Sequence, residues 1–291
     1  MPRRFLVIGA DGLVGRHVAG ALPAADVLRT SRRGIAGEPT LDITDSDAVR
    51  RVIREARPDV IVLAAADAYV ERCEREPAKT RRVNVDAARV VAASAKEREA
   101  LLVVFSSEYV FDGAAGPYSE ADERRPINEY GRQKVALEDI ALDTGRALIC
   151  RTSGVFGMDQ KRRNFVHQLV ERLRAGQTFD VPSDQLVTPT FAPALAGAVV
   201  ELARSGSTGP YHVAGPQIMS RVDFAQAVAK AFGLDASLLR PRETRELSLA
   251  APRPKRAGLD TRKVSAALGH PLTAPIDGLR ELAGSESAQA H

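Results

Sequence analysis

Short apolar runs alternate with amphipathic stretches along the first half of the chain, and this alternation constrains the fold more than any other feature. The runs are FLVIG (5–9), DVLRTS (26–31), DVIVLAAA (59–66), LLVVFSS (101–107) and ALICRTS (147–153). Such runs are typical of strands that are buried on both faces of a parallel sheet. The stretches between them carry apolar residues at helical spacing. The pattern therefore predicts a doubly wound α/β parallel sheet of the Rossmann type, with right-handed crossovers.

The second half is less regular and predicts a smaller lobe. We expect helices in FVHQLVERLRAG (165–176) and SRVDFAQAVAKAFG (220–233), and a strand in GPYHVAG (209–215). The stretch 240–256 is rich in proline and arginine, which favours a loop. The expected domains are a nucleotide-binding domain over 1–153, to which 190–215 return, and a substrate-binding lobe formed by 154–189 and 216–291.

Composition excludes several classes of protein. Of the 291 residues, 44% are hydrophobic and 27% are charged, and no apolar run approaches the ~18 residues of a membrane helix. The first apolar stretch, about five residues long, is too short for a signal peptide, so we expect a cytoplasmic protein. The net charge of +4 is spread along the chain and aromatic residues make up only 5%. This argues against a nucleic-acid partner and favours small phosphorylated ligands.

Cysteines and histidines give no sign of a metal site. Cys73 and Cys150 form no CxxC pattern, and the five histidines are scattered. Metal sites need ligands at characteristic short spacings. We therefore expect two reduced, buried thiols and no metal.

A glycine-rich turn follows the first apolar run. Gly9, Gly12 and Gly15 have GxxGxxG spacing, and Leu13 and Val14 open the next expected helix. Glycines at these positions permit a tight turn and bring backbone N–H groups against a pyrophosphate at the helix N-terminus. Turn glycines without a ligand are the alternative, but the position between a strand and a helix favours a dinucleotide site.

The end of the second expected strand bears on the choice of dinucleotide. Binders of the non-phosphorylated form usually place an acidic residue there to hold the ribose hydroxyls. This chain has Ser31, Arg32 and Arg33 instead. Two guanidinium groups could pair with a ribose phosphate, and no carboxylate would repel it. We infer NADP(H), with a solvated arginine pair as the alternative.

The segment that begins at the fourth expected strand carries three further motifs. SSEYVFDG, PYSE and YGRQK stand in order within residues 103–138. They resemble the extended short-chain dehydrogenase/reductase superfamily and, more narrowly, the dTDP-4-dehydrorhamnose reductase family. Similar segments flank them over nearly the whole chain: CEREP, VNVDAARV, ICRTSGVFG, DQLVTPT, YHVAG and RPKRAGLDTRK.

The resemblance implies a catalytic group of Ser107, Tyr130 and Lys134. The last two stand four residues apart and would share one face of a helix. A nearby ammonium is expected to lower the pKa of Tyr130, so that it can act as the acid. Ser107 would hydrogen-bond the substrate carbonyl, and Lys134 would also hold the nicotinamide ribose.

The implied activity is NADPH-dependent reduction of a keto group on a nucleotide-linked sugar, with a dTDP-4-keto-6-deoxy sugar as the expected class. Tyr130 would supply the proton. Further cofactor contacts are assigned to Asp42, Ile43, Ala64, Ala65 and Ala66, beside Tyr130 and Lys134 themselves. Substrate contacts are assigned to Glu108, Tyr109, Gly154, Asn164, Gln185 and Arg253.

Some positions depart from the family pattern. Gly154 stands where these reductases often have tryptophan, and Asp67 stands where a tyrosine is usual, with Tyr69 nearby. The identity of the sugar, its nucleotide and the product stereochemistry therefore stay open. Glu108-Tyr109 replaces the Asp-Glu pair of the related dehydratases, which argues against dehydration.

Two other functions are compatible with the same motifs. One is a non-catalytic NADP-binding regulatory subunit that resembles the methionine adenosyltransferase β subunit, and the other is a nucleotide-sugar epimerase. The arginine pair favours an exchangeable NADPH over the retained NAD of epimerases. The oligomeric state, a homodimer included, and any need for magnesium stay open.

Overall fold

The central layer of the protein is a six-stranded sheet, seen in a computed structural model that describes residues 3–35 and 37–289. The strands are β1 (Phe5–Ile8), β2 (Val27–Thr30), β3 (Val60–Leu63), β4 (Leu101–Ser107), β5 (Ala147–Thr152) and β10 (Gly209–His212). Their order is β10-β5-β4-β3-β1-β2, and every neighbouring pair is parallel. The predicted Rossmann-type α/β fold is confirmed. The chain reverses its direction across the sheet between β1 and β3, where such folds open a ligand crevice.

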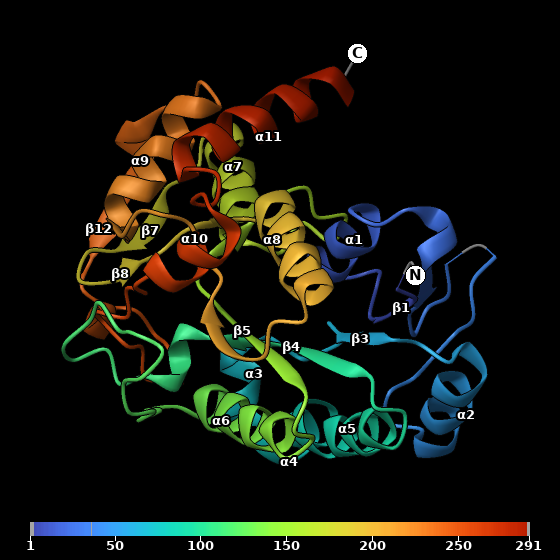
Figure 1. Cartoon of the computed structure of the whole chain (residues 1–291). Coiled ribbons are helices and arrows are strands. Elements are labelled where there is room, and N and C mark those ends of the chain that lie inside the picture. The colour runs from blue at the N-terminus through green and yellow to red at the C-terminus, as the bar shows by residue number, and fades with distance from the viewer. Residues whose placement is uncertain (1–2, 36, 290–291) are drawn as a thin grey trace.

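Helices cover both faces of this sheet (Figure 1). The helices on one face are α1 (Leu13–Gly20), α8 (Ala192–Ser205) and α10 (Arg262–Leu268). Those on the other face are α2 (Ser46–Ala56), α5 (Ala87–Glu97) and α6 (Glu129–Leu142). Strands β1, β3, β4 and β5 are buried at every residue, which is why their sequences are continuous apolar runs instead of alternating ones.

The stretch 78–97, which has the pattern of a single helix, is divided in the structure. It contains most of α4 (Pro77–Arg81), then a π-helical turn η2 (Arg82–Asp86), and then α5. Asn84 in this turn accepts a hydrogen bond from the Asp67 backbone N–H at 2.7 Å and donates one to the Asp67 carbonyl at 2.9 Å. The turn thereby fixes the segment that leads from β3 to the short helix α3 (Val70–Arg75).

A second apolar core lies beside the main sheet. It packs helices α7 (Phe165–Arg174), α9 (Arg221–Ala231) and α11 (Pro275–Gln289) around three two-stranded pairs. The pairs join β6 (Val155–Phe156) to β9 (Thr190–Phe191), β7 (Phe179–Pro182) to β12 (Leu239–Arg242), and β8 (Leu186–Val187) to β11 (Met219–Ser220). The expected loop over 240–256 is partly wrong, because β12 runs into it. The expected strand over 209–215 is β10, at the edge of the main sheet.

Both cysteines, Cys73 and Cys150, are free and buried, as predicted. Within the described residues, no helix is long and apolar enough to cross a membrane. Over the same part of the chain, no group of three or more His, Cys, Asp or Glu side chains could hold a metal ion.

Candidate active site

The glycine-rich turn is built so that its chain segments touch. Gly9 has a φ of 91°, and a Cβ atom there would lie 2.5 Å from the Ala65 nitrogen. A Cβ atom on Gly15 would lie 2.2 Å from the Gly9 carbonyl oxygen. The Gly9 N–H donates to the Thr30 carbonyl at the end of β2, at 2.9 Å. Only glycine fits Gly9 and Gly15, and the turn is held between the ends of three strands.

This turn meets the requirements of an anion site. Gly12 is the N-cap of α1 and provides no side-chain oxygen, and the first turn of α1 contains no acidic residue. Leu13 and Val14 begin the helix there, at the positive end of its dipole. The nearby Ser31 hydroxyl at the end of β2 is buried and, among the described residues, has no hydrogen-bond partner. A buried polar atom without a partner is costly unless a ligand satisfies it, so these residues fit a bound dinucleotide.

The two arginines after β2 are free to meet a ligand. Arg32 and Arg33 are exposed, and within the described ranges neither forms an ion pair. Asp42, across the same loop region, is also exposed, and hydrogen bonds from Thr44 lower its pKa, so that it is ionised at neutral pH. Ile43 is buried in the core under the sheet, which gives its side chain a packing role.

The three alanines after β3 lie at the same edge of the sheet. Ala65 lies against Gly9, Ala64 is partly buried, and Ala66 is exposed. Small side chains here leave room beside the glycine turn, although their contact with a cofactor stays a prediction.

The three predicted catalytic residues come from β4 and α6. Ser107 is the last residue of β4, and Tyr130 and Lys134 lie in the first turns of α6. Asn128 caps this helix by accepting the Gly131 N–H at 2.8 Å. The Lys134 ammonium lies 5.4 Å from the centroid of the Tyr130 ring and donates to the Phe105 carbonyl of β4 at 2.7 Å. Tyr130 and Lys134 therefore share one face, which is fixed to the strand that presents Ser107.

Burial is the main cause of the shifted pKa values of Tyr130 and Lys134. Tyr130 and Lys134 are 9% and 4% exposed. Burial raises the pKa of Tyr130, and Glu108 raises it further when ionised, while the Ser107 hydroxyl acts in the opposite direction. Burial also lowers the pKa of Lys134 to about 8. The expected lowering of the Tyr130 pKa by Lys134 is wrong for this structure, because burial raises that pKa and Tyr130 keeps its proton.

Glu108 lies directly beside Ser107, the predicted catalytic serine. The two side chains are 4% and 6% exposed, and Ser107 Oγ lies 2.6 Å from Glu108 Oε2. Burial raises the pKa of Glu108, which hydrogen bonds from Ser107 and Ser153 and the charge of Arg221 only partly oppose. Arg221, at the start of α9, is a residue that the sequence analysis missed, because its position is that of an ordinary helix start.

Tyr109 and Arg253 form a wall next to Tyr130. The Tyr109 ring meets the Tyr130 ring edge to face, with centroids 5.7 Å apart. The Arg253 guanidinium lies 5.8 Å from the Tyr109 centroid and pairs with Glu71 at 2.6 Å. A second nitrogen of Arg253, Nη1, is buried and has no partner among the described residues. Both residues lie beside Tyr130, and their contact with a substrate stays a prediction.

The other predicted substrate contacts have local structural roles. Asn164 caps α7 and also donates to the Gly157 carbonyl at 3.1 Å. The Gln185 side chain donates to Thr244 Oγ1 at 2.9 Å. Gly154 has a φ of 52° and follows Ser153, which places it near Glu108. Gln185 also adjoins this region, because its carbonyl accepts the Arg221 backbone N–H at 2.9 Å.

A basic turn before α7 reaches across to the cofactor side. Lys161 lies 2.8 Å from Asp11 of the glycine turn. The Arg163 guanidinium lies 5.6 Å from the centroid of the Tyr69 ring, and Tyr69 is 40% exposed. The sequence predicts neither pairing, because the partners are far apart along the chain.

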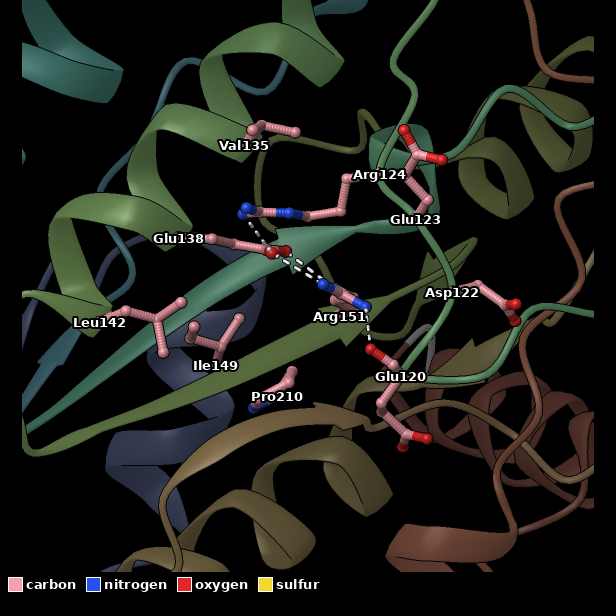
Figure 2. A pocket seen from close by; sticks show the side chains of 10 residues that line it. All are labelled: Glu120, Asp122, Glu123, Arg124, Val135, Glu138, Leu142, Ile149, Arg151 and Pro210. Carbon is pink, nitrogen blue, oxygen red and sulfur yellow. Dashed lines mark hydrogen bonds and ion pairs between the residues drawn. The ribbon is translucent and has the colours of Figure 1, made fainter.

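A buried ion-pair cluster anchors α6 from its other end (Figure 2). Glu138 receives hydrogen bonds from Arg151 of β5 at 2.9 Å and from Ser106 of β4 at 2.5 Å, and Arg124 joins it at 3.2 Å. Burial alone would raise the pKa of Glu138, but Arg151, Ser106 and Arg124 together outweigh burial and hold that pKa below its usual value. The adjoining cavity of about 380 Å³ is lined by these charged groups. It is not lined by Tyr130, so it is not the catalytic site.

Fold and site together define a dinucleotide-dependent short-chain dehydrogenase/reductase. The model of a family described as RmlD substrate binding domain matches residues 3–285. The chain belongs to this family, and the predicted resemblance is confirmed.

Related proteins with printed activities support this assignment. A dTDP-4-keto-6-deoxy-D-glucose reductase of Streptomyces niveus is 33% identical over 275 residues, which cover 93% of this chain and 90% of that protein. Methionine adenosyltransferase 2 subunit beta of Pongo abelii is 32% identical over 273 residues, covering 90% of this chain and 81% of that protein. The crystal structure of a Bacillus anthracis dTDP-4-dehydrorhamnose reductase in complex with NADP has a TM-score of 0.88 and 27% identity, and the match covers 97% of this chain and 99% of that chain.

Proposed function

We propose that this protein is an NADPH-dependent reductase of a keto group on a nucleotide-linked sugar, with dTDP-4-keto-6-deoxy sugars as the substrate class. The observation that carries the proposal is the placement of Ser107, Tyr130 and Lys134 on β4 and α6, at the sheet edge that also holds the glycine turn. The reductases among the relatives support the same activity.

Bound NADPH would supply the hydride, and the residues of this chain would position the substrate and deliver the proton. Tyr130 is protonated because of its raised pKa, so it can donate to the oxygen of the keto group as that oxygen becomes negative. Ser107 can hydrogen-bond the same oxygen. Lys134 is fixed on Phe105 and keeps a positive charge on this face of α6 below a pH of about 8.

The cofactor would be held by the glycine turn and the residues after β2. Backbone N–H groups at Leu13 and Val14 would bind the pyrophosphate. Ser31, Arg32 and Arg33 would meet the ribose phosphate. On the substrate side, Arg253 would offer its unpartnered Nη1 to the nucleotide diphosphate.

The test is a cofactor-oxidation screen over a panel of nucleotide keto-sugars, with the Tyr130→Phe variant beside the unmodified protein. The variant keeps the ring but has no proton to donate. We expect turnover to fall by roughly 10²–10⁴-fold, with NADPH affinity little changed. Near-normal turnover in this variant would exclude Tyr130 as the acid, and no oxidation with any keto-sugar would reject the reductase proposal.

The regulatory alternative has one observation in its favour, the similarity to methionine adenosyltransferase 2 subunit beta. The buried arrangement of Ser107, Tyr130 and Lys134 favours the enzyme instead, because a regulatory subunit has no need of a positioned acid. Two expectations from the sequence, a cytoplasmic location and a homodimer, stay predictions. Light scattering after size-exclusion chromatography would measure the oligomeric state.

A further inference from the structure

The Ser107 hydroxyl has more potential hydrogen-bond partners than it can satisfy at once. It has one hydrogen and two lone pairs. The Tyr109 backbone N–H, at 3.3 Å, takes one lone pair. Ser107 Oγ donates to Glu108 Oε2 at 2.6 Å if Glu108 is ionised, and a protonated Glu108 can donate to the second lone pair of Ser107 instead. Which of these two hydrogen bonds forms depends on whether Glu108 carries a proton.

An ionised Glu108 would prevent Ser107 from donating a hydrogen bond to the substrate. A carboxylate only accepts hydrogen bonds, so it would take the one hydrogen of Ser107. Ser107 would then have no hydrogen for the substrate oxygen. Its remaining lone pair could then accept a hydrogen bond from the Tyr130 hydroxyl. Both donors would be turned away from the keto group.

We infer that Glu108 acts in its protonated form as a positioning residue for Ser107. Its carboxylic O–H donates to Ser107 Oγ, and the hydrogen of Ser107 is thereby directed to the substrate oxygen. Glu108 keeps its proton throughout, and Tyr130 alone transfers one. This inference rests on the proposed reductase function, because it assigns Ser107 a substrate oxygen to bind.

The surroundings of Glu108 favour the protonated form. It is almost fully buried, and burial of a carboxyl group disfavours its charge. The charged and titratable groups that act on it or with it are Arg221 of α9, Tyr130 of α6 and the adjacent Tyr109. Arg221 is the one cation among them, and its effect is smaller than that of burial. Ser153, after β5, adds a neutral hydrogen bond.

The test replaces Glu108 with glutamine and with leucine. The amide of Glu108→Gln can donate to Ser107 at every pH, whereas Glu108→Leu cannot donate at all. In the unmodified protein, we expect kcat/KM for keto-sugar reduction to fall as pH rises through the raised pKa of Glu108. In Glu108→Gln, kcat/KM should not fall with pH. For each protein we compare kcat/KM one pH unit above this pKa with its own value at low pH, and this ratio should be about tenfold higher for Glu108→Gln than for the unmodified protein. Glu108→Leu should be slow at every pH.

A second measurement does not depend on the substrate. Infrared spectra at neutral pH should show the carbonyl stretch of a buried protonated carboxylic acid, absent in Glu108→Gln. The matched control is Glu138→Gln, which removes another buried glutamate that is ionised by its pairing with Arg151 and should retain the band. Thermal melts and NADPH titrations of each variant establish that it is folded.

Each outcome decides the matter. Parallel pH profiles for the unmodified protein and Glu108→Gln, or a folded Glu108→Gln as slow as Glu108→Leu, would overturn the inference. So would the absence of the acid band in the unmodified protein. If no keto-sugar is reduced, the proposed function fails, and the infrared band still decides the state of Glu108.

Discussion

Replacing Arg32 and Arg33 together by alanine should weaken NADPH binding at least tenfold and change NADH binding little. Both side chains are exposed after β2 and form no ion pair within the described part of the chain, so their loss should cost the fold little. One charge-assisted hydrogen bond contributes ~1.5–3 kcal/mol, and ~1.4 kcal/mol corresponds to a factor of ten. Because the site is exposed, solvent and salt weaken the interaction, so we expect a loss of binding free energy near the lower end of this range.

The assay is direct titration of both cofactors by calorimetry at one fixed salt concentration. The matched control is Arg51→Ala with Arg54→Ala, which removes the same charge from the exposed side of α2. We expect the control to bind NADPH normally. Of the two single variants after β2, Arg32→Ala should have the larger effect, because Arg32 is nearer the strand end. Tighter binding of NADH than NADPH by the unmodified protein, or an equal loss for both cofactors, would refute the reasoning.

Two further predictions concern the glycine turn and acid stability. Gly15→Ala places a Cβ atom 2.2 Å from the Gly9 carbonyl, so calorimetry should show at least about tenfold weaker binding of both cofactors; unchanged affinity would contradict the close packing. Burial lowers the pKa of His212 from 6.5 to about 4. As the pH falls between these two values, the unfolded chain binds a proton at this histidine before the folded chain does. The free energy of unfolding should therefore be highest above a pH of about 6.5 and should decrease by roughly 2–3 kcal/mol toward pH 4. Urea unfolding across this pH range should show that the free energy of unfolding depends less on pH in His212→Gln than in the unmodified protein. An equal dependence on pH in both would argue against a neutral buried histidine.

The sequence predicted those elements whose pattern is local. Strands β1, β3, β4 and β5 could be predicted because they are buried at every residue and are therefore mostly apolar. The pairing of Tyr130 with Lys134 could be predicted because helical spacing alone brings them to one face. By contrast, β12 contains arginine and proline and lacks any strand pattern, since its register with β7 comes from tertiary packing.

The features that the sequence could not predict depend on distant contacts. The π-helical turn at Asn84 follows from its hydrogen bonds to Asp67, not from helix propensity. The raised pKa of Glu108 arises from burial by several elements, and that burial is invisible in the SSEYVFDG motif. The contact of Lys161 with Asp11 joins segments 150 positions apart, which no local pattern could indicate.

The tie between Lys134 and the Phe105 carbonyl has an evolutionary consequence. It joins α6 to β4 within one contiguous stretch of the chain that holds Ser107, Tyr130 and Lys134. The segment 216–291 still supports this site, because Asn128 at the start of α6 donates to the Pro252 carbonyl at 2.8 Å and Arg221 acts on Glu108. Residues 154–189 and 216–291, the predicted substrate-binding lobe, can therefore change while the tie between Lys134 and β4 is kept. Grafting these two segments from a relative onto this chain would test whether they determine which sugar is accepted.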